Sequence, residues 1–143
     1  MASTVSRPVE TFHRAVEELA EARTRSDRLK GREAAEKAWL AVVEATDRYL
    51  ARKGIVIPED RTAHSQRRRA LYTLGRDGLR RTYSDLAISL HGDVFYFDDP
   101  GVSPKELDAL FADAARYVEE MTGKHGLLKE VLDMGRGGGY RAG

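Results

Sequence analysis

Apolar side chains recur every three or four residues through most of this 143-residue chain, which is the spacing of one face of an α-helix. The pattern is broadest in residues 31–54, whose apolar face includes Trp39. Such a face must be buried against another element. The strand-like run IVIPED, at residues 55–60, has no second strand pattern to pair with and predicts a packed loop. The chain is therefore expected to be all-α.

Glycine and proline predict where the first helices begin and end. A helix is expected over residues 8–28, because proline suits the first helical position, and Gly31 is expected to mark the break after it. Gly54 is the expected C-terminal stop of the second helix. Residues 61–90 are interrupted by two glycines, which predicts two helices joined near Arg76.

The clearest boundary is Ser103-Pro104-Lys105-Glu106, where serine can cap a helix that proline starts. This helix is expected to end at Gly123, and a short helix is expected over residues 127–134. Together the elements predict one antiparallel bundle of four to five helices. Its domain would span residues 8–134, between a flexible N-terminus at 1–7 and a flexible glycine-rich tail at 135–143.

The composition and motifs of the chain argue against membrane, metal-binding and cofactor-binding functions. The chain has no cysteine, no secretory leader pattern and no run of about 20 apolar residues, so we expect a cytoplasmic protein with no membrane partner. A di-iron bundle needs two Glu-x-x-His pairs, and only Glu10 and His13 match. Residues 135–139 are glycine-rich but lack the Lys-Ser/Thr of a phosphate loop. We therefore expect no metal and no cofactor.

Charge is unevenly distributed. Residues 61–81 hold seven arginines and one acid, a net charge of +6, whereas residues 93–120 hold eight acids and two bases, a net charge of −6. We expect the two segments to neutralise one another within the bundle or across a dimer. The alternative is a phosphate-binding face for RNA or a nucleotide, in which His64 orients the ligand. Its arginines would be Arg61, Arg67, Arg68 and Arg69. The alternatives differ in whether these guanidinium groups are occupied by Asp98, Asp99, Asp108 and Asp113.

A second candidate site is a small polar pocket at one end of the bundle, formed by His64, His91, Tyr96 and Asp98. Each histidine also stands near a helix end, where it could cap carbonyl groups or anchor a loop, and that structural role is the alternative.

Three segments resemble a known family: AAEKAWLAVVEAT at residues 34–46, HSQRR at 64–68 and LHGDVFYF at 90–97. The pattern, over roughly residues 10–122, resembles the PaREP-type proteins, small helical bundles similar to HEPN (higher eukaryotes and prokaryotes nucleotide-binding) domains. The resemblance implies a bundle of four or five helices that is often dimeric. Some HEPN relatives are ribonucleases or partners of nucleotidyltransferases.

The ribonucleases among these relatives have an arginine and a later histidine separated by four to six residues, which brings a cation and a proton-transfer group to a phosphodiester. Here only Arg7 and His13 have that spacing, and they lie at the start of the chain rather than late in the bundle. We therefore expect a non-enzymatic interaction module that acts as a homodimer and binds a protein partner. The alternative is a nucleotide or RNA phosphate-binding protein that uses residues 61–81 and has weak ribonuclease activity.

Overall fold

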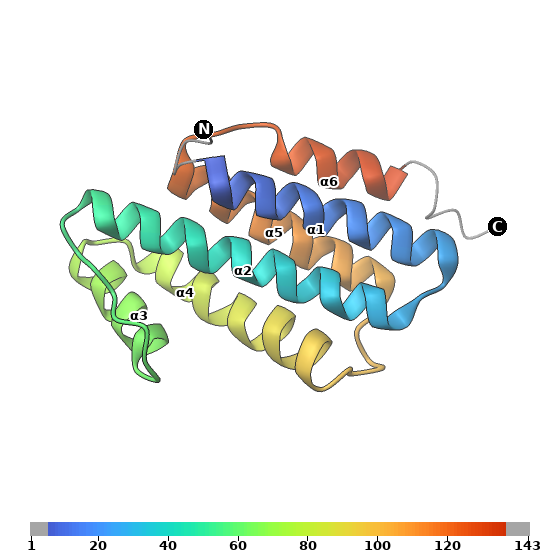
Figure 1. Cartoon of the computed structure of the whole chain (residues 1–143), viewed down its shortest axis with the longest axis horizontal. Helices are drawn as coiled ribbons and strands as arrows, with labels where there is room; N and C mark the ends of the chain where they lie inside the picture. Colours follow the sequence, from blue (N-terminus) through green and yellow to red (C-terminus); the bar gives the residue numbers. More distant parts are fainter. Residues whose placement is uncertain (1–5, 137–143) are drawn as a thin grey trace.

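The computed structural model describes residues 6–136, which form six α-helices and one π-helical segment and contain no β-strand (Figure 1). The expected all-α helical bundle is confirmed, but it has six α-helices among the described residues where four to five were expected. The expected flexible ends fall largely on residues 1–5 and 137–143, which lie outside the described residues. In chain order the elements are α1 (Ser6–Arg25), α2 (Arg28–Arg52), α3 (Ala63–Thr73), α4 (Asp77–Leu86), η1 (Ala87–Tyr96), α5 (Pro104–Thr122) and α6 (Leu127–Arg136).

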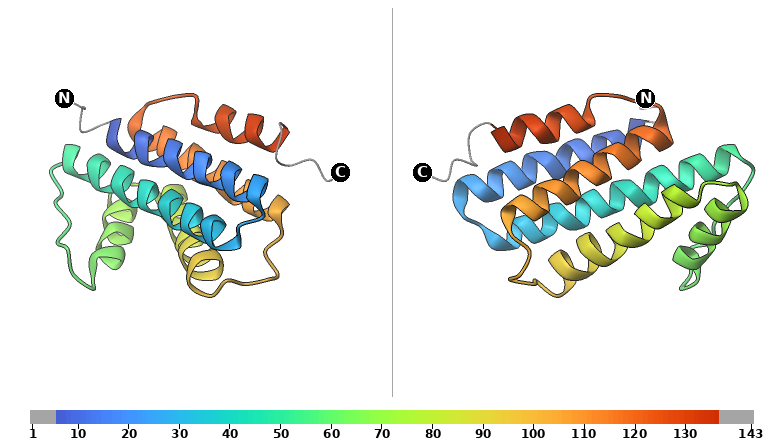
Figure 2. Two further views of the ribbon diagram at one scale, coloured as in Figure 1. Left: turned by 45° about the vertical axis from the view of Figure 1, so that its right-hand side comes forward. Right: turned by 180° about the vertical axis from the view of Figure 1, so that it is seen from behind.

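The centre of the bundle is α2, which contacts α1, α5 and η1. Helix α6 lies along α1 and α5, and α3 projects from the bundle near the C-terminal end of α2, beside α4 (Figure 2). The largest fully buried side chains include Phe12, Leu50, Tyr83, Phe111 and Met121, contributed by four of these helices. Burying one large apolar side chain contributes about 1.5–3 kcal/mol, so the shared apolar faces hold the bundle together. No helix among residues 6–136 is both long and apolar enough to cross a membrane.

The break between the first two helices was predicted at Gly31, and that prediction is wrong. The chain turns at Ser26, which has a positive φ of 52°, and Asp27 then caps α2 by accepting a hydrogen bond from the Lys30 N–H. Gly31 lies inside α2, where a Cβ would meet the Cβ of Ala22 on α1 at an ordinary 3.9 Å. A helical glycine costs only about 1 kcal/mol relative to alanine, and packing against α1 overrides that preference.

The first helix, predicted over residues 8–28, runs from Ser6 to Arg25, and the helical segment predicted to end near residue 90 continues to Tyr96. Several other predicted boundaries are observed. Residues 55–60 form a loop, and Gly75, with φ 74°, separates α3 from α4. The Ser103 side chain accepts a hydrogen bond from the Glu106 N–H, with Pro104 in the first turn of α5. Gly123 ends α5 with φ 73°, a left-handed conformation that favours glycine.

The segment η1 was not predicted as a distinct element. It is a π-helix of 10 residues, and its wider turns are seen where the Phe97 N–H bonds to the Gly92 carbonyl oxygen, five residues back, at 2.9 Å. π-helical turns are uncommon and are frequent at functional sites. This one carries His91 and places it against α2.

Candidate functional site

Aromatic and charged side chains from four helices gather around Trp39, which is only 4% exposed. The Trp39 ring centroid lies 5.7 Å from that of His64 on α3, 5.0 Å from that of Tyr83 on α4 and 6.2 Å from that of His91 on η1. We call these four residues, together with Arg67, the Trp39 cluster. The expected meeting of His64 and His91 is therefore seen, with the indole of Trp39 in contact with both.

Geometry fixes the proton position on His64. The Tyr83 hydroxyl lies 2.7 Å from His64 Nδ1, and Arg67 Nη1 lies 3.2 Å from the same nitrogen. An arginine N–H can only donate, so Nδ1 accepts and a neutral ring carries its proton on Nε2. Burial, followed by the nearby charges of Arg67 and His91, lowers the pKa of His64 and favours that neutral form. His64 therefore presents an N–H donor and has no free lone pair.

Arg67 is a buried structural residue. Its Nε lies 2.7 Å from Asp47 Oδ1 on α2, its Nη2 lies 3.0 Å from Oδ2, and its Nη1 donates to the Tyr83 hydroxyl at 3.2 Å. Burial is the largest single effect and disfavours its charge, but the interactions with Asp47 and Tyr83 together outweigh burial, so the pKa of Arg67 is raised. Arg67 was predicted to bind phosphate, but two carboxylate oxygens of Asp47 already occupy the fork of its guanidinium group, so Arg67 is less available for that role than an unpaired arginine.

His91 has the opposite hydrogen-bonding character to His64. Its Nδ1 lies 2.7 Å from Glu36 Oε1, and because a carboxylate accepts, Nδ1 carries the proton. The other nitrogen, Nε2, then has a free lone pair when the ring is neutral. The His91 side chain is 40% exposed, so the two histidines of the Trp39 cluster offer one donor and one acceptor near the protein surface.

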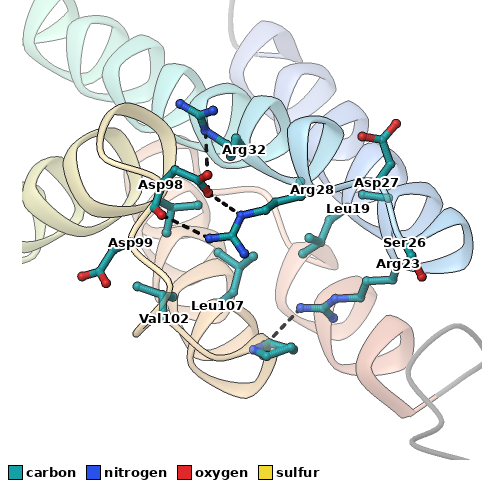
Figure 3. A pocket seen from close by; sticks show the side chains of 14 residues that line it. Leu19, Arg23, Ser26, Asp27, Arg28, Arg32, Asp98, Asp99, Val102 and Leu107 are labelled. Atoms are coloured by element: carbon teal, nitrogen blue, oxygen red, sulfur yellow. Dashed lines mark hydrogen bonds and ion pairs between the residues drawn. The ribbon is translucent and has the colours of Figure 1, made fainter.

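The predicted pocket of four residues is divided in the structure. Tyr96 packs against His91 with ring centroids 6.2 Å apart and is 68% exposed. Asp98 lies farther along the same side of α2, where it accepts a hydrogen bond from Arg28 Nε at 2.8 Å and lies 3.9 Å from Arg32 Nε (Figure 3). Asp98 therefore does not belong to the Trp39 cluster.

The arginines of residues 61–81 fall into two groups. Four are paired: Arg67 with Asp47, Arg76 with Glu120, and both Arg80 and Arg81 with Asp77. The other three, Arg61, Arg68 and Arg69, make no hydrogen bond or ion pair within residues 6–136.

The acids proposed as their partners are engaged elsewhere or bond only to backbone. Asp98 pairs with Arg28, Asp108 with Arg23 and Asp113 with Arg116, while Asp99 accepts a backbone N–H from Gly101. The expected neutralisation of one segment by the other is thus limited to Arg76 and Glu120 among the described residues.

Arg69 lines a hollow of about 470 Å³ between α3 and the loop at residues 55–57. The same hollow is lined by the polar residues Thr62, Ser65, Gln66 and Thr73 and by the apolar residues Ile55, Ile57 and Ala70. Arg69 is the one charged residue in this lining, so the hollow offers a cation with hydroxyl-bearing residues nearby, which suits an anionic oxygen ligand.

The other sequence motifs do not form a site. Arg7 pairs with Glu44 at 3.0 Å, whereas His13 pairs with Glu130 on α6, so each residue is held by a different acid. Within residues 6–136, no three histidine or acidic side chains converge in a way that could hold a metal ion.

Sequence reasoning missed Glu36 and Asp47, the two acids that orient the Trp39 cluster. A partial signal exists, because Glu36 and Trp39, like His64 and Arg67, are three residues apart and share a helix face. Tyr83 carries a buried hydroxyl, and burial raises its pKa.

In comparisons with known proteins, no family model matches this chain, and no curated protein or solved structure matches it significantly.

Proposed function

We propose that this protein acts in the cytoplasm and binds the phosphate groups of a nucleotide ligand, in particular of single-stranded RNA. The binding surface is the outer face of α3 together with Arg61, which lies just before this helix. The observation that carries the proposal is that Arg61, Arg68 and Arg69 have no acidic partner within residues 6–136, in a chain whose acids mostly have other partners. Unpaired guanidinium groups keep their full capacity to fork onto phosphate oxygens.

Neighbouring groups support the same ligand. His64 follows Arg61 at the start of α3 and presents an N–H donor, while Arg69 lines the hollow beside the loop. Tyr72, on the same helix, is 67% exposed, and an exposed aromatic ring can stack on a base. The resemblance to HEPN-type bundles agrees with this proposal, because some of those proteins act on RNA.

Binding is favoured over catalysis by the state of His64. A general base needs a free lone pair at the proton it removes, and His64 Nδ1 already accepts hydrogen bonds from Tyr83 and Arg67. Its role in the proposed complex is to donate a hydrogen bond from Nε2 to a phosphate oxygen.

Fluorescence anisotropy with short labelled single-stranded RNA tests the proposal. Three phosphate contacts give a slope of about −2 in log affinity against log salt, so binding is expected to weaken roughly 20-fold between ~50 and ~200 mM salt. The triple variant Arg61→Ala/Arg68→Ala/Arg69→Ala should lose most of the affinity and flatten the salt slope. A labelled mononucleotide in a parallel titration separates a nucleotide site from an RNA surface.

The matched control is Arg14→Ala/Arg25→Ala/Arg116→Ala, which removes the same charge from exposed positions on α1 and α5. It should retain nearly all of the RNA affinity. Equal loss in both triple variants would mean that only net charge matters, and no saturable binding at the lower salt would reject the proposal.

A second candidate function is a protein-interaction module that acts as a homodimer. It is favoured by Tyr96 and Phe97, which are 68% and 73% exposed with ring centroids 5.7 Å apart. Neighbouring exposed aromatic rings are typical of interaction surfaces. Light scattering after size-exclusion chromatography tests it: the wild type should be dimeric and Phe97→Ser monomeric, and a wild-type monomer over a range of concentrations would reject the dimer.

A further inference from the structure

The indole N–H of Trp39 has no hydrogen-bond partner within residues 6–136. Trp39 is only 4% exposed, and a buried tryptophan usually places its N–H against an acceptor. In this part of the chain, the unpartnered side-chain atoms that are also shut off from solvent are Glu18 Oε2 and Glu44 Oε1, so Trp39 Nε1 keeps contact with solvent. The small exposed part of Trp39 therefore includes a hydrogen-bond donor that the bundle does not use.

The acceptor beside this donor is His91. Its ring centroid lies 6.2 Å from that of the indole, with 32° between the two planes. Glu36 holds Nδ1 of His91, so the neutral ring keeps its lone pair on Nε2, and no group within residues 6–136 bonds to that nitrogen. Two rings in contact thus offer one donor and one acceptor. This pair complements the edge of a nucleobase, where an acceptor and a donor stand next to each other.

Aromatic rings next to His91 suit the face of the same base. Phe95 stacks on His91 with ring centroids 6.1 Å apart, and Tyr96, with its centroid 6.2 Å from that of His91, is 68% exposed. Proteins recognise single-stranded RNA by stacking unpaired bases on such rings while hydrogen-bonding the base edges. All three side chains belong to η1, and π-helical turns are frequent at functional sites.

The phosphate-binding surface proposed on α3 is adjacent to these rings. His64, whose Nε2–H is assigned to a phosphate oxygen, also packs on the indole of Trp39, with ring centroids 5.7 Å apart. The same indole contacts His91 on η1. Trp39 therefore lies between a histidine of the phosphate surface and a histidine with a free acceptor, as expected if one nucleotide places its phosphate on α3 and its base against η1.

We propose that Trp39, His91 and Tyr96 form a base site, which binds an unpaired nucleobase of the RNA whose phosphates lie on α3. The indole N–H of Trp39 donates to the edge of the base, His91 Nε2 accepts from it, and Tyr96 stacks on its face. The base site depends on the proposed RNA binding and adds recognition of a base to that of the phosphates. Every common base has a neighbouring acceptor and donor on its edge, so the site selects unpaired bases rather than one sequence.

Intrinsic fluorescence tests the base site directly, because Trp39 is the one tryptophan in the chain. The probes are a short mixed-sequence single-stranded RNA and an abasic oligoribonucleotide with the same number of phosphates, both titrated at ~50 mM salt. The RNA should quench Trp39 saturably, and the abasic strand should not. In fluorescence anisotropy, the labelled RNA should bind about tenfold more tightly than the labelled abasic strand.

Variants assign this preference to η1. His91→Phe keeps a ring but removes the acceptor, so it should reduce the preference for RNA over the abasic strand about threefold or more and leave the salt slope unchanged. Tyr96→Ala should reduce the preference similarly, and because Tyr96 is an exposed side chain, this variant tests the base site even if His91→Phe does not fold. His125→Phe, at an exposed histidine in the loop before α6, is the matched control and should keep the full preference.

The outcomes separate the base site from the phosphate surface. Equal affinity for both strands without quenching of Trp39 would overturn the base site and leave the phosphate surface of α3 in place. A preference for RNA that persists in folded His91→Phe and in Tyr96→Ala would also overturn it, because base recognition would then belong to another ring, such as that of Tyr72. Failure of both strands to bind would instead reject the proposed RNA binding itself, and the base site with it.

Discussion

Removing Asp47 should lower the free energy of unfolding more than removing Arg67, its ion-pair partner. The Arg67 side chain is 9% exposed, whereas that of Asp47 is 41% exposed. In Asp47→Asn the guanidinium group stays buried without a counter-charge, and breaking a buried pair in this way costs about 3 kcal/mol. In Arg67→Met the carboxylate left behind can be hydrated, so the cost is nearer that of the lost hydrogen bonds, about 1.5 kcal/mol.

These free energies convert into melting temperatures through the entropy of unfolding. At roughly 2.1 cal/mol/K per residue, a chain of 143 residues has an unfolding entropy of about 0.3 kcal/mol/K. Asp47→Asn should therefore lower the Tm by about 10 °C, and Arg67→Met by about 5 °C.

Urea denaturation followed by circular dichroism measures both variants, together with the double variant that completes the cycle. Asp113→Asn is the matched control, because its pair with Arg116 is more than half exposed and should contribute less than about 1 kcal/mol. The reasoning would be refuted if Arg67→Met cost more than Asp47→Asn, or if Asp47→Asn were as mild as Asp113→Asn.

Three further predictions concern single side chains. Ser103→Ala should lower the free energy of unfolding by about 1 kcal/mol in urea, because it removes the cap of α5. Gly123→Ala should destabilise the protein by a similar amount, because Gly123 has a φ of 73°. Gly78→Ala, in open space on α4, should instead stabilise it by about 0.5–1 kcal/mol. If urea denaturation showed both variants to change the free energy of unfolding in the same direction, this prediction would be contradicted. Because the pKa of His64 is lowered in the folded state, the unfolded chain binds the proton more readily, so wild-type stability should fall as pH drops below about 6.5. The Tm of His64→Gln should fall less between about pH 7.5 and 5.5, and an equal fall would contradict the assignment.

Features governed by neighbouring residues were predictable from the sequence. Ser103 and Pro104 specify the start of α5 through their own side chains, and Gly123 specifies its end through its own φ. Gly31 was wrongly predicted to end a helix, because its place inside α2 depends on packing against α1, which approaches it at Ala22. The turn occurs instead at Ser26 and Asp27, where the cap is also a local interaction that favours aspartate.

The π-helical segment η1 shows what local patterns cannot provide. Its apolar spacing is compatible with an α-helix, and the shift to bonds five residues apart, as between Phe97 and Gly92, has no composition signal. The register of this segment decides which side chains face α2. His91 reaches Glu36 on α2, while Asp98, just beyond the end of η1, reaches Arg28 at the start of the same helix. Sequence alone therefore grouped Asp98 with His91, and the structure separates them.

The three consecutive arginines of α3 show why charge alone did not identify a site. Successive residues on a helix point about 100° apart, so Arg67, Arg68 and Arg69 cannot all face the same way. Arg67 faces Asp47 on α2, a partner outside the acidic segment that the charge pattern suggested, and Arg69 faces the hollow beside the loop. Arg67 therefore holds α3 in place while its two neighbours stay available. It follows that Arg67→Met, assayed well below its Tm, should reduce stability but retain RNA affinity, because the phosphate contacts are proposed for the neighbours. If its RNA affinity fell as far as that of the triple variant, the division of these arginines into structural and ligand-binding residues would be wrong.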